Sequence, residues 1–153
     1  MVTYRPYWAL VVFALVSGAA GCDDPAGPER DALNANRELW RSQEIVSYRY
    51  EYRLNCFCGG PGSEPVAIEV SDGEVARVTI LERSEEVPPS QLIDYPTIED
   101  LFETIEDWLS RDPHEVSTDY HAELGYPIDV FIDFIENAID EELGFVASRL
   151  VEL

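Results

Sequence analysis

Two segments of the chain repeat their apolar side chains with the period of an α-helix. Over residues 29–43 the apolar positions fall near one face, with Arg and Glu elsewhere. Over residues 98–109 the apolar spacing is that of a regular amphipathic helix. Thr97 caps this second helix, with Asp100 three residues on as in a capping box, and Asp112-Pro113 ends it. The pattern predicts two helices that each bury one face.

Elsewhere apolar and polar positions alternate, which is the period of a half-buried β-strand. Asp72-Gly73, between the second and third such segments, is the two-residue turn of a tight hairpin. Residues 82–96, which hold three prolines, are predicted to form a polar connector. The predicted strands are residues 45–58, 66–70, 75–81, 115–121, 128–134 and 145–151.

The order of the predicted elements is helix, three strands, helix, three strands. Helices that are grouped apart from antiparallel strands are typical of the α+β class. We therefore expect an antiparallel sheet of about six strands with the two helices packed on one face. One domain over residues 31–153 accounts for this chain length. The two halves could also be a degenerate internal repeat of one helix and a three-stranded meander.

The first 21 residues have the pattern of a secretory signal. Arg5 is followed by an apolar run over residues 7–16, shorter than the about 20 residues of a membrane-spanning helix, and then by small residues. Ala19-Ala20-Gly21-Cys22 resembles a bacterial lipobox, with alanine where leucine is usual at its first position. Cys22 is thus the predicted lipidation site and residues 22–30 the predicted tether. The alternative is an ordinary signal cut that leaves Cys22 as a free thiol.

Acidic residues dominate the composition. The chain has 31 Asp and Glu against 10 basic residues, a formal net charge of -21, and every basic residue is Arg. A nucleic acid or an anionic lipid surface would be repelled by this charge, so neither is an expected partner. The absence of lysine from the sequence excludes Schiff-base chemistry, a lysine nucleophile and a P-loop.

Cys56-Phe57-Cys58 holds the only thiols besides Cys22. In a strand both side chains would point to one face with their Cα atoms about 6.6 Å apart, at the long end of the range for a disulfide. An oxidising envelope favours the bond, and we predict a structural disulfide or clip. The alternative is a redox pair, although redox folds usually place two residues between the cysteines, at the start of a helix.

Carboxylates crowd the segment before Gly144 and suggest a Ca²⁺ site between Asp133 and Glu142. The sequence lacks an Asp-x-Asp-x-Asp-Gly loop, so a solvated acidic turn is favoured. His114 and His121 have no partner at zinc-site spacing, and we predict no metal and no cofactor. The oxygen-bearing side chains of the acidic segment are Asp129, Asp133, Glu136, Asn137, Asp140, Glu141 and Glu142.

The motifs of the common hydrolases are missing from the sequence. It has no Gly-x-Ser-x-Gly elbow and no Ser-x-x-Lys, and nothing singles out a glycosidase pair among its 31 acids. Tyr48, Tyr50 and Tyr52 share one face of a predicted strand and could line a groove for a sugar or a peptide. We expect them instead to pack on Trp40 and Trp108 in the core, whereas an exposed face would favour binding.

Several short motifs follow one another along the chain: Trp40, Tyr48-x-Tyr50, Cys56-x-Cys58, Val66-x-Ile68-x-Val70-x-Asp72-Gly73, Thr97-Ile98-Glu99-Asp100-Leu101-Phe102, Gly125-Tyr126-Pro127, Asp133 and Asp140. Together they resemble the domain-of-unknown-function family 6174, a set of exported bacterial proteins, often lipoproteins, with no assigned activity. The resemblance covers about residues 35–150. It implies the order of elements given above and an extracytoplasmic location, and it implies no catalytic residue.

We therefore expect a bacterial cell-envelope lipoprotein that is held on a membrane through Cys22. Its domain would be a non-enzymatic binding or structural module outside the cytoplasm, with an envelope protein, a peptide or a glycan as partner. The sequence leaves open whether the membrane is the inner or the outer one. The alternative is an exported thiol-redox protein that uses Cys56 and Cys58, and a weaker third hypothesis is a Ca²⁺-stabilised domain.

Overall fold

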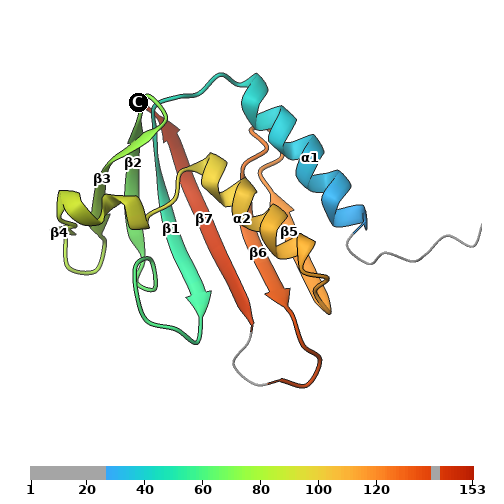
Figure 1. Cartoon of the computed structure of the whole chain (residues 1–153). Coiled ribbons are helices and arrows are strands. Elements are labelled where there is room, and N and C mark those ends of the chain that lie inside the picture. The colour runs from blue at the N-terminus through green and yellow to red at the C-terminus, as the bar shows by residue number, and fades with distance from the viewer. Residues whose placement is uncertain (1–26, 139–141) are drawn as a thin grey trace, which may run out of the picture.

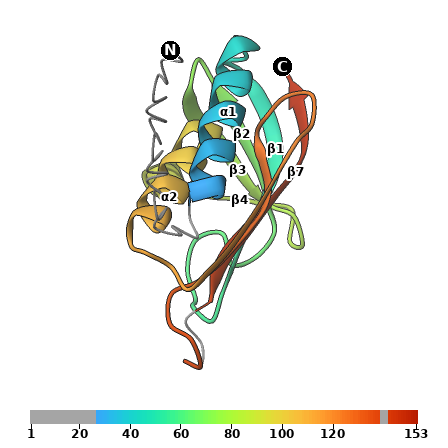
Figure 2. The ribbon, with the colours of Figure 1, turned by 90° about the vertical axis from the view of Figure 1, so that its right-hand side faces the viewer.

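The computed structural model describes residues 27–138 and 142–153. In this part of the chain one antiparallel sheet of seven strands carries two α-helices on one face, which confirms the α+β class (Figure 1, Figure 2). The helices are α1 (Gly27–Ser42) and α2 (Ile98–Ser110), and a short 3-10 helix, η1 (Pro89–Asp94), precedes α2. The strands are β1 (Tyr48–Cys56), β2 (Val66–Ser71), β3 (Glu74–Ile80), β4 (Glu85–Glu86), β5 (Glu115–Tyr120), β6 (Pro127–Asp133) and β7 (Leu143–Glu152).

The two halves of the chain meet in the middle of the sheet, where β1 pairs with β7. The strand order is β4-β3-β2-β1-β7-β6-β5. The β1–β7 ladder runs from Tyr48 opposite Glu152 to Cys56 opposite Leu143. The first and last strands of the described domain therefore hold its two halves together, although they lie far apart in the sequence.

The sheet has one strand more than the six expected. β4 consists of Glu85 and Glu86, which pair with Ile80 and Thr79 of β3. A two-residue strand of exposed acidic side chains has no alternating apolar pattern, so the periodicity could not reveal it. The expected polar connector over residues 82–96 also contains the helix η1, which the sequence did not predict.

The two three-stranded meanders are not copies of one fold. Three antiparallel pairings separate β1 from β5, so the first strands of the two meanders run in opposite directions. Both meanders nevertheless cross the sheet in the same direction, from β1 to β3 and from β5 to β7. A rotation that superimposes them would move one helix to the other face, whereas α1 and α2 share a face (Figure 2). The suggested internal repeat is therefore not a repeat of the fold.

Helix α2 buries the apolar face that its sequence predicts. All six apolar side chains of the predicted stripe are buried, and the capping box at its start is formed. The Thr97 N–H donates to the Asp100 carboxylate over 2.8 Å, and the Asp100 N–H donates to the Thr97 hydroxyl over 3.2 Å. Helix α1 buries less, because only Leu33 and Trp40 of its expected face are fully covered. Helix α2 therefore covers more of the core than α1 does.

Aromatic side chains form a continuous series of contacts through the core, the aromatic chain. Its three tyrosines come from β1 and expose 3%, 0% and 7% of their surface. The series runs Trp40, Tyr48, Tyr50, Tyr52, Phe145 and Trp108, with neighbouring ring centroids 5.4, 6.0, 6.4, 6.0 and 6.1 Å apart. The tyrosine face of β1 is core, as predicted, and is not an exposed surface for a sugar or a peptide.

Two of these tyrosines also fix the start of α2. The Tyr48 hydroxyl accepts a hydrogen bond from the Ile98 N–H over 2.8 Å, and the Tyr50 hydroxyl donates to the Pro96 carbonyl. Ile98 is the first residue of the helix, where an N–H has no partner within the helix itself. Burial raises the pKa of Tyr48 to about 12 and that of Tyr50 well above its ordinary value, so both hydroxyls stay protonated at neutral pH.

The loop between β5 and β6 rests on helix α1. Gly125 has a φ of +79°, and a Cβ at this position would lie 2.5 Å from the Asn36 carbonyl oxygen, so only glycine fits. The next residue, Tyr126, packs edge-on against Trp40 with 6.3 Å between ring centroids. His121 stacks on the Tyr126 ring, with 5.0 Å between ring centroids. The Gly125-Tyr126-Pro127 motif thus helps to hold α1 on the sheet.

Helix α1 begins at Gly27, inside the segment that the sequence assigned to a tether. The Arg30 side chain in its first turn donates to the Leu109 carbonyl near the end of α2 over 2.6 Å, so this part of the expected tether belongs to the domain. The predicted signal, Cys22 and the rest of the tether lie outside the described residues. None of the described helices is both long enough and apolar enough to cross a membrane.

Candidate functional site

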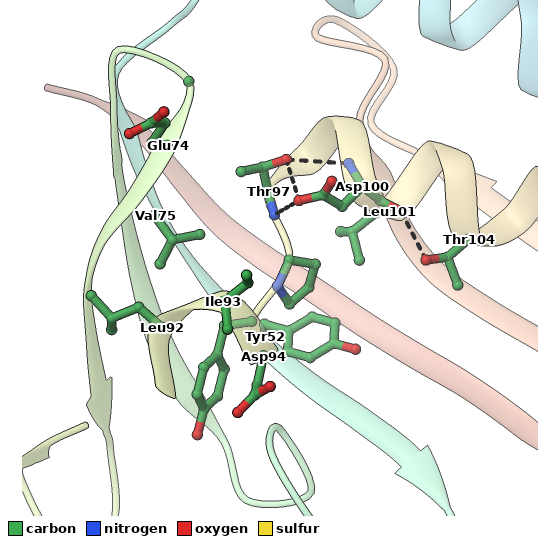
Figure 3. A pocket seen from close by; sticks show the side chains of 13 residues that line it. Tyr52, Glu74, Val75, Leu92, Ile93, Asp94, Thr97, Asp100, Leu101 and Thr104 are labelled. Atoms are coloured by element: carbon green, nitrogen blue, oxygen red, sulfur yellow. Dashed lines mark hydrogen bonds between the residues drawn. The ribbon is translucent and has the colours of Figure 1, made fainter. Parts of the chain in front are cut away.

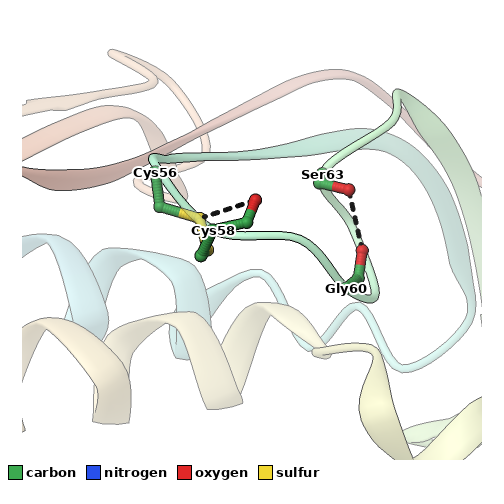
Figure 4. The surroundings of a disulfide bond; sticks show 4 residues. All are labelled: Cys56, Cys58, Gly60 and Ser63. Carbon is green, nitrogen blue, oxygen red and sulfur yellow. Dashed lines mark hydrogen bonds between the residues drawn. A yellow bond between two sulfur atoms is a disulfide. The ribbon is translucent and has the colours of Figure 1, made fainter. Parts of the chain in front are cut away.

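The two cysteines that the sequence paired are bonded to each other at the end of β1 (Figure 4). The Cα atoms of Cys56 and Cys58 are 5.1 Å apart, closer than in an extended strand, because the chain bends at Phe57. Phe57 itself is 82% exposed. In the loop between this bend and β2, the Ser63 hydroxyl donates to the Gly60 carbonyl over 2.8 Å. The disulfide therefore lies at the end of β1, at an exposed corner of the domain.

The surroundings of this disulfide do not supply what a redox thiol needs. A hollow of about 340 Å³ beside it is lined by Asp129 and Glu142 together with apolar and amide side chains, and its lining holds no Arg or His. Nearby carboxylates disfavour a thiolate, whereas reactive thiols sit near positive charge or at a helix start. The described geometry therefore favours a structural clip over thiol exchange.

The acidic segment after β6 shows turn-forming contacts in its described part. The Asp133 carboxylate accepts a hydrogen bond from the Ile135 N–H over 3.0 Å. His121 is engaged in a similar way, since its Nδ1 accepts from the Leu124 N–H over 3.2 Å. Among the described residues, no three His, Cys, Asp or Glu side chains come together as metal ligands. Residues 139–141, which include Asp140 and Glu141, lie outside the described part, and the Ca²⁺ hypothesis stays a prediction.

A groove of about 700 Å³ opens between the β2–β3 hairpin, η1 and the start of α2 (Figure 3). We call it the hairpin groove. Its volume is in the range of pockets that hold a small ligand or a few residues of a peptide. Its lining consists of Tyr52, Gly73, Glu74, Val75, Leu92, Ile93, Asp94, Tyr95, Pro96, Thr97, Asp100, Leu101 and Thr104.

The hairpin groove combines apolar side chains with carboxylates. Val75 and Leu92 are partly buried against the core, while Ile93 is 90% exposed. The lining contains no His, Cys, Lys or Arg side chain, so it offers neither a nucleophile with a base nor a partner for an anion. Its carboxylates are Glu74 on the hairpin, Asp94 on η1 and Asp100 on α2. This chemistry suits contacts with a positively charged group.

Sequence reasoning missed the hairpin groove. The sequence correctly predicted the Asp72-Gly73 turn, the strand after it and the capped start of α2, but residues 82–96 were expected to form only a polar connector. The signal that could have revealed η1 was Pro89, which is favoured at the start of a helix, followed by Leu92 and Ile93. Only the folded chain shows that these three elements surround one space.

The chain forms a small α+β domain with an acidic, partly apolar groove. The chain belongs to the family of unknown function DUF6174, whose model matches residues 32–152. This match confirms the family that the sequence motifs suggested. The comparisons with curated proteins and with solved structures found no match.

The described motifs that carried the resemblance serve the fold. Tyr48-x-Tyr50 positions the start of α2, and the motif at residues 97–102 forms the capping box and part of the core. Gly125-Tyr126-Pro127 holds α1. Because these motifs are architectural, family membership supports the fold and does not by itself identify a ligand.

Proposed function

We propose that the protein is a cell-envelope lipoprotein whose domain acts outside the cytoplasm as a non-enzymatic binding module. The amino-terminal pattern supports export, and Cys22 at its end supports lipidation. The Cys56–Cys58 disulfide at an exposed corner is consistent with this location, because such bonds persist in oxidising compartments and are rare in the cytosol.

The hairpin groove is the observation that carries the binding role. It is open to solvent, it brings together side chains from four elements, and Ile93 stands in it largely uncovered. An exposed large apolar side chain contributes nothing to the core, whereas a ligand that covers it gains its hydrophobic burial. The Asp100 carboxylate is engaged in the capping box through its Oδ2 atom.

The intact mass of the protein from its own cell envelope tests the location and the anchor. The protein is isolated without reductant and with free thiols alkylated. We expect a chain that starts at Cys22, is heavier by its acyl groups and carries no label on Cys56 or Cys58. A Cys22→Ser variant is the matched control and should lose the acyl groups while its disulfide remains. An unacylated wild-type chain would contradict the lipoprotein proposal.

The disulfide decides between the proposed module and the redox alternative. We expect the Cys56–Cys58 bond to resist equilibration with glutathione, as structural disulfides of exported proteins do. A bond that exchanges near the potential of glutathione would favour the thiol-redox function instead. Turnover of a thiol, ester or glycoside substrate by the purified protein, abolished by alanine at one cluster, would contradict the non-enzymatic role.

A further inference from the structure

We propose that the hairpin groove binds a basic peptide segment of an envelope partner, one that carries apolar side chains among its lysine or arginine residues. The inference rests on the proposed function and specifies its ligand. It follows from three features of the groove: a helix start that carries a carboxylate and has most of its N–H groups bonded, carboxylates on three separate elements, and an uncovered apolar side chain.

The start of α2 is a poor site for an anionic ligand, because most of its N–H groups already have partners. Free N–H groups at a helix start ordinarily attract phosphate or carboxylate groups. Here the Ile98 N–H donates to the Tyr48 hydroxyl over 2.8 Å, and the Asp100 N–H donates to the Thr97 hydroxyl over 3.2 Å. The Leu101 N–H donates to the Thr97 carbonyl over 3.1 Å. The Asp100 carboxylate adds a negative charge at the same place, so the groove repels anions.

Three carboxylates line the groove, each from a different element. They are Glu74 on the hairpin, Asp94 on η1 and Asp100 on α2, and the lining includes no basic side chain. Both hydrogen bonds that Thr97 gives to Asp100 use the Oδ2 atom, and no described residue bonds the Oδ1 atom. A lysine or arginine side chain can therefore pair with these groups without displacing an existing ion pair.

The apolar side chains select a peptide over a small cation. Val75 and Leu92 form a partly buried surface within the groove, and Ile93 remains 90% exposed. A polyamine or metal ion would leave this surface in water. A peptide that carries both basic and apolar side chains offers charge to the carboxylates and apolar surface to Ile93 at once.

The test is fluorescence anisotropy with labelled synthetic peptides, using the full chain in a mild non-ionic detergent. One peptide alternates lysine with leucine, and a second alternates lysine with serine. The groove variant is Glu74→Gln/Asp94→Asn, which leaves the capping residue Asp100 in place. The matched control is Glu115→Gln/Asp119→Asn, which removes the same two charges from exposed positions on β5, at the opposite edge of the sheet.

We expect the lysine–leucine peptide to bind the wild-type protein and to bind the groove variant about tenfold more weakly. The control variant should stay within about twofold, because charge at the far edge is screened at physiological salt. An Ile93→Ala variant should weaken the lysine–leucine peptide and leave the lysine–serine peptide unchanged. Equal losses in the groove variant and the control would reduce the binding to general charge attraction and overturn the proposal.

Failure of the two proposals can be told apart. If the protein carries acyl groups on Cys22 but the lysine–leucine peptide does not bind, the basic ligand is wrong and the envelope module stands. If the peptide binds as expected but the native chain is not acylated, the ligand is right and the lipoprotein assignment is wrong. Each measurement therefore decides one statement independently of the other.

Discussion

The hydroxyl of Tyr48 offers the sharpest test of how the sheet positions helix α2. Phenylalanine at this position preserves the buried ring and its contact with Trp40, but it removes the acceptor that the Ile98 N–H uses over 2.8 Å. Both residues are buried, so water cannot replace the lost partner. A buried N–H without a partner costs about 1–3 kcal/mol. We expect Tyr48→Phe to lower the free energy of unfolding by that amount.

Tyr52→Phe is the matched control for this substitution. Tyr52 is also buried on β1, two residues beyond Tyr50, but its hydroxyl makes no hydrogen bond with any described residue. Its loss should therefore change the free energy of unfolding by less than about 0.5 kcal/mol. Tyr50→Phe should fall between the two, because it leaves the Pro96 carbonyl without a donor, and a carbonyl tolerates this better than an N–H.

Urea unfolding at pH 7 measures these differences, with an unchanged dependence on denaturant as the check that both states keep their compactness. Hydrogen exchange adds a local reading, since the Ile98 amide should lose protection in Tyr48→Phe and keep it in Tyr52→Phe. Equal stabilities of the Tyr48 and Tyr52 variants would refute the reasoning, because the hydrogen bond to the helix start would then contribute nothing.

Two further predictions concern stability. Gly125→Ala should destabilise the protein by about 2–5 kcal/mol in urea unfolding, since strain at a φ of +79° adds to the clash with the Asn36 carbonyl. Gly73→Ala shares the positive φ but has no atom within 4 Å of the new Cβ, so it should cost only about 1–2 kcal/mol, and equal costs would contradict the close approach. Burial raises the pKa of Tyr48 and Tyr52 to about 12, so above pH 10 the unfolded chain releases protons that the folded protein retains. The free energy of unfolding should then fall between about pH 10 and 12, and a flat profile in urea titrations across that window would contradict the burial of these hydroxyls.

The elements that the sequence predicted are those with strong periodicity. The apolar residues of α2 and of β1 each form one buried face, so their spacing in the sequence follows directly from the packing. The short strand β4 and the helix η1 bury too little to leave such a pattern. Sequence reasoning could also propose a repeat from the order of elements, but only the pairing of β1 with β7 shows that the two halves differ in handedness.

The candidate site was predictable only in pieces. The disulfide partners were evident from Cys56-Phe57-Cys58, although the bend that brings them together was not. The hairpin groove depends on how the turn at Gly73, the segment at Leu92 and the helix start at Thr97 converge in space. Such convergence is set by tertiary packing, and the local spacing of polar and apolar residues does not encode it.

The aromatic chain gives the domain an internal optical reporter. Trp40 and Trp108 are the only tryptophans after the predicted signal. They lie at the two ends of the aromatic chain, with the β1 tyrosines between them. Excitation absorbed by these tyrosines can pass to the tryptophans across ring contacts of 5.4 to 6.4 Å, so tyrosine emission should be weak in the folded protein and rise on unfolding. Because Tyr52 belongs both to this chain and to the lining of the hairpin groove, a ligand there would be seen in the near-ultraviolet spectrum without any added label.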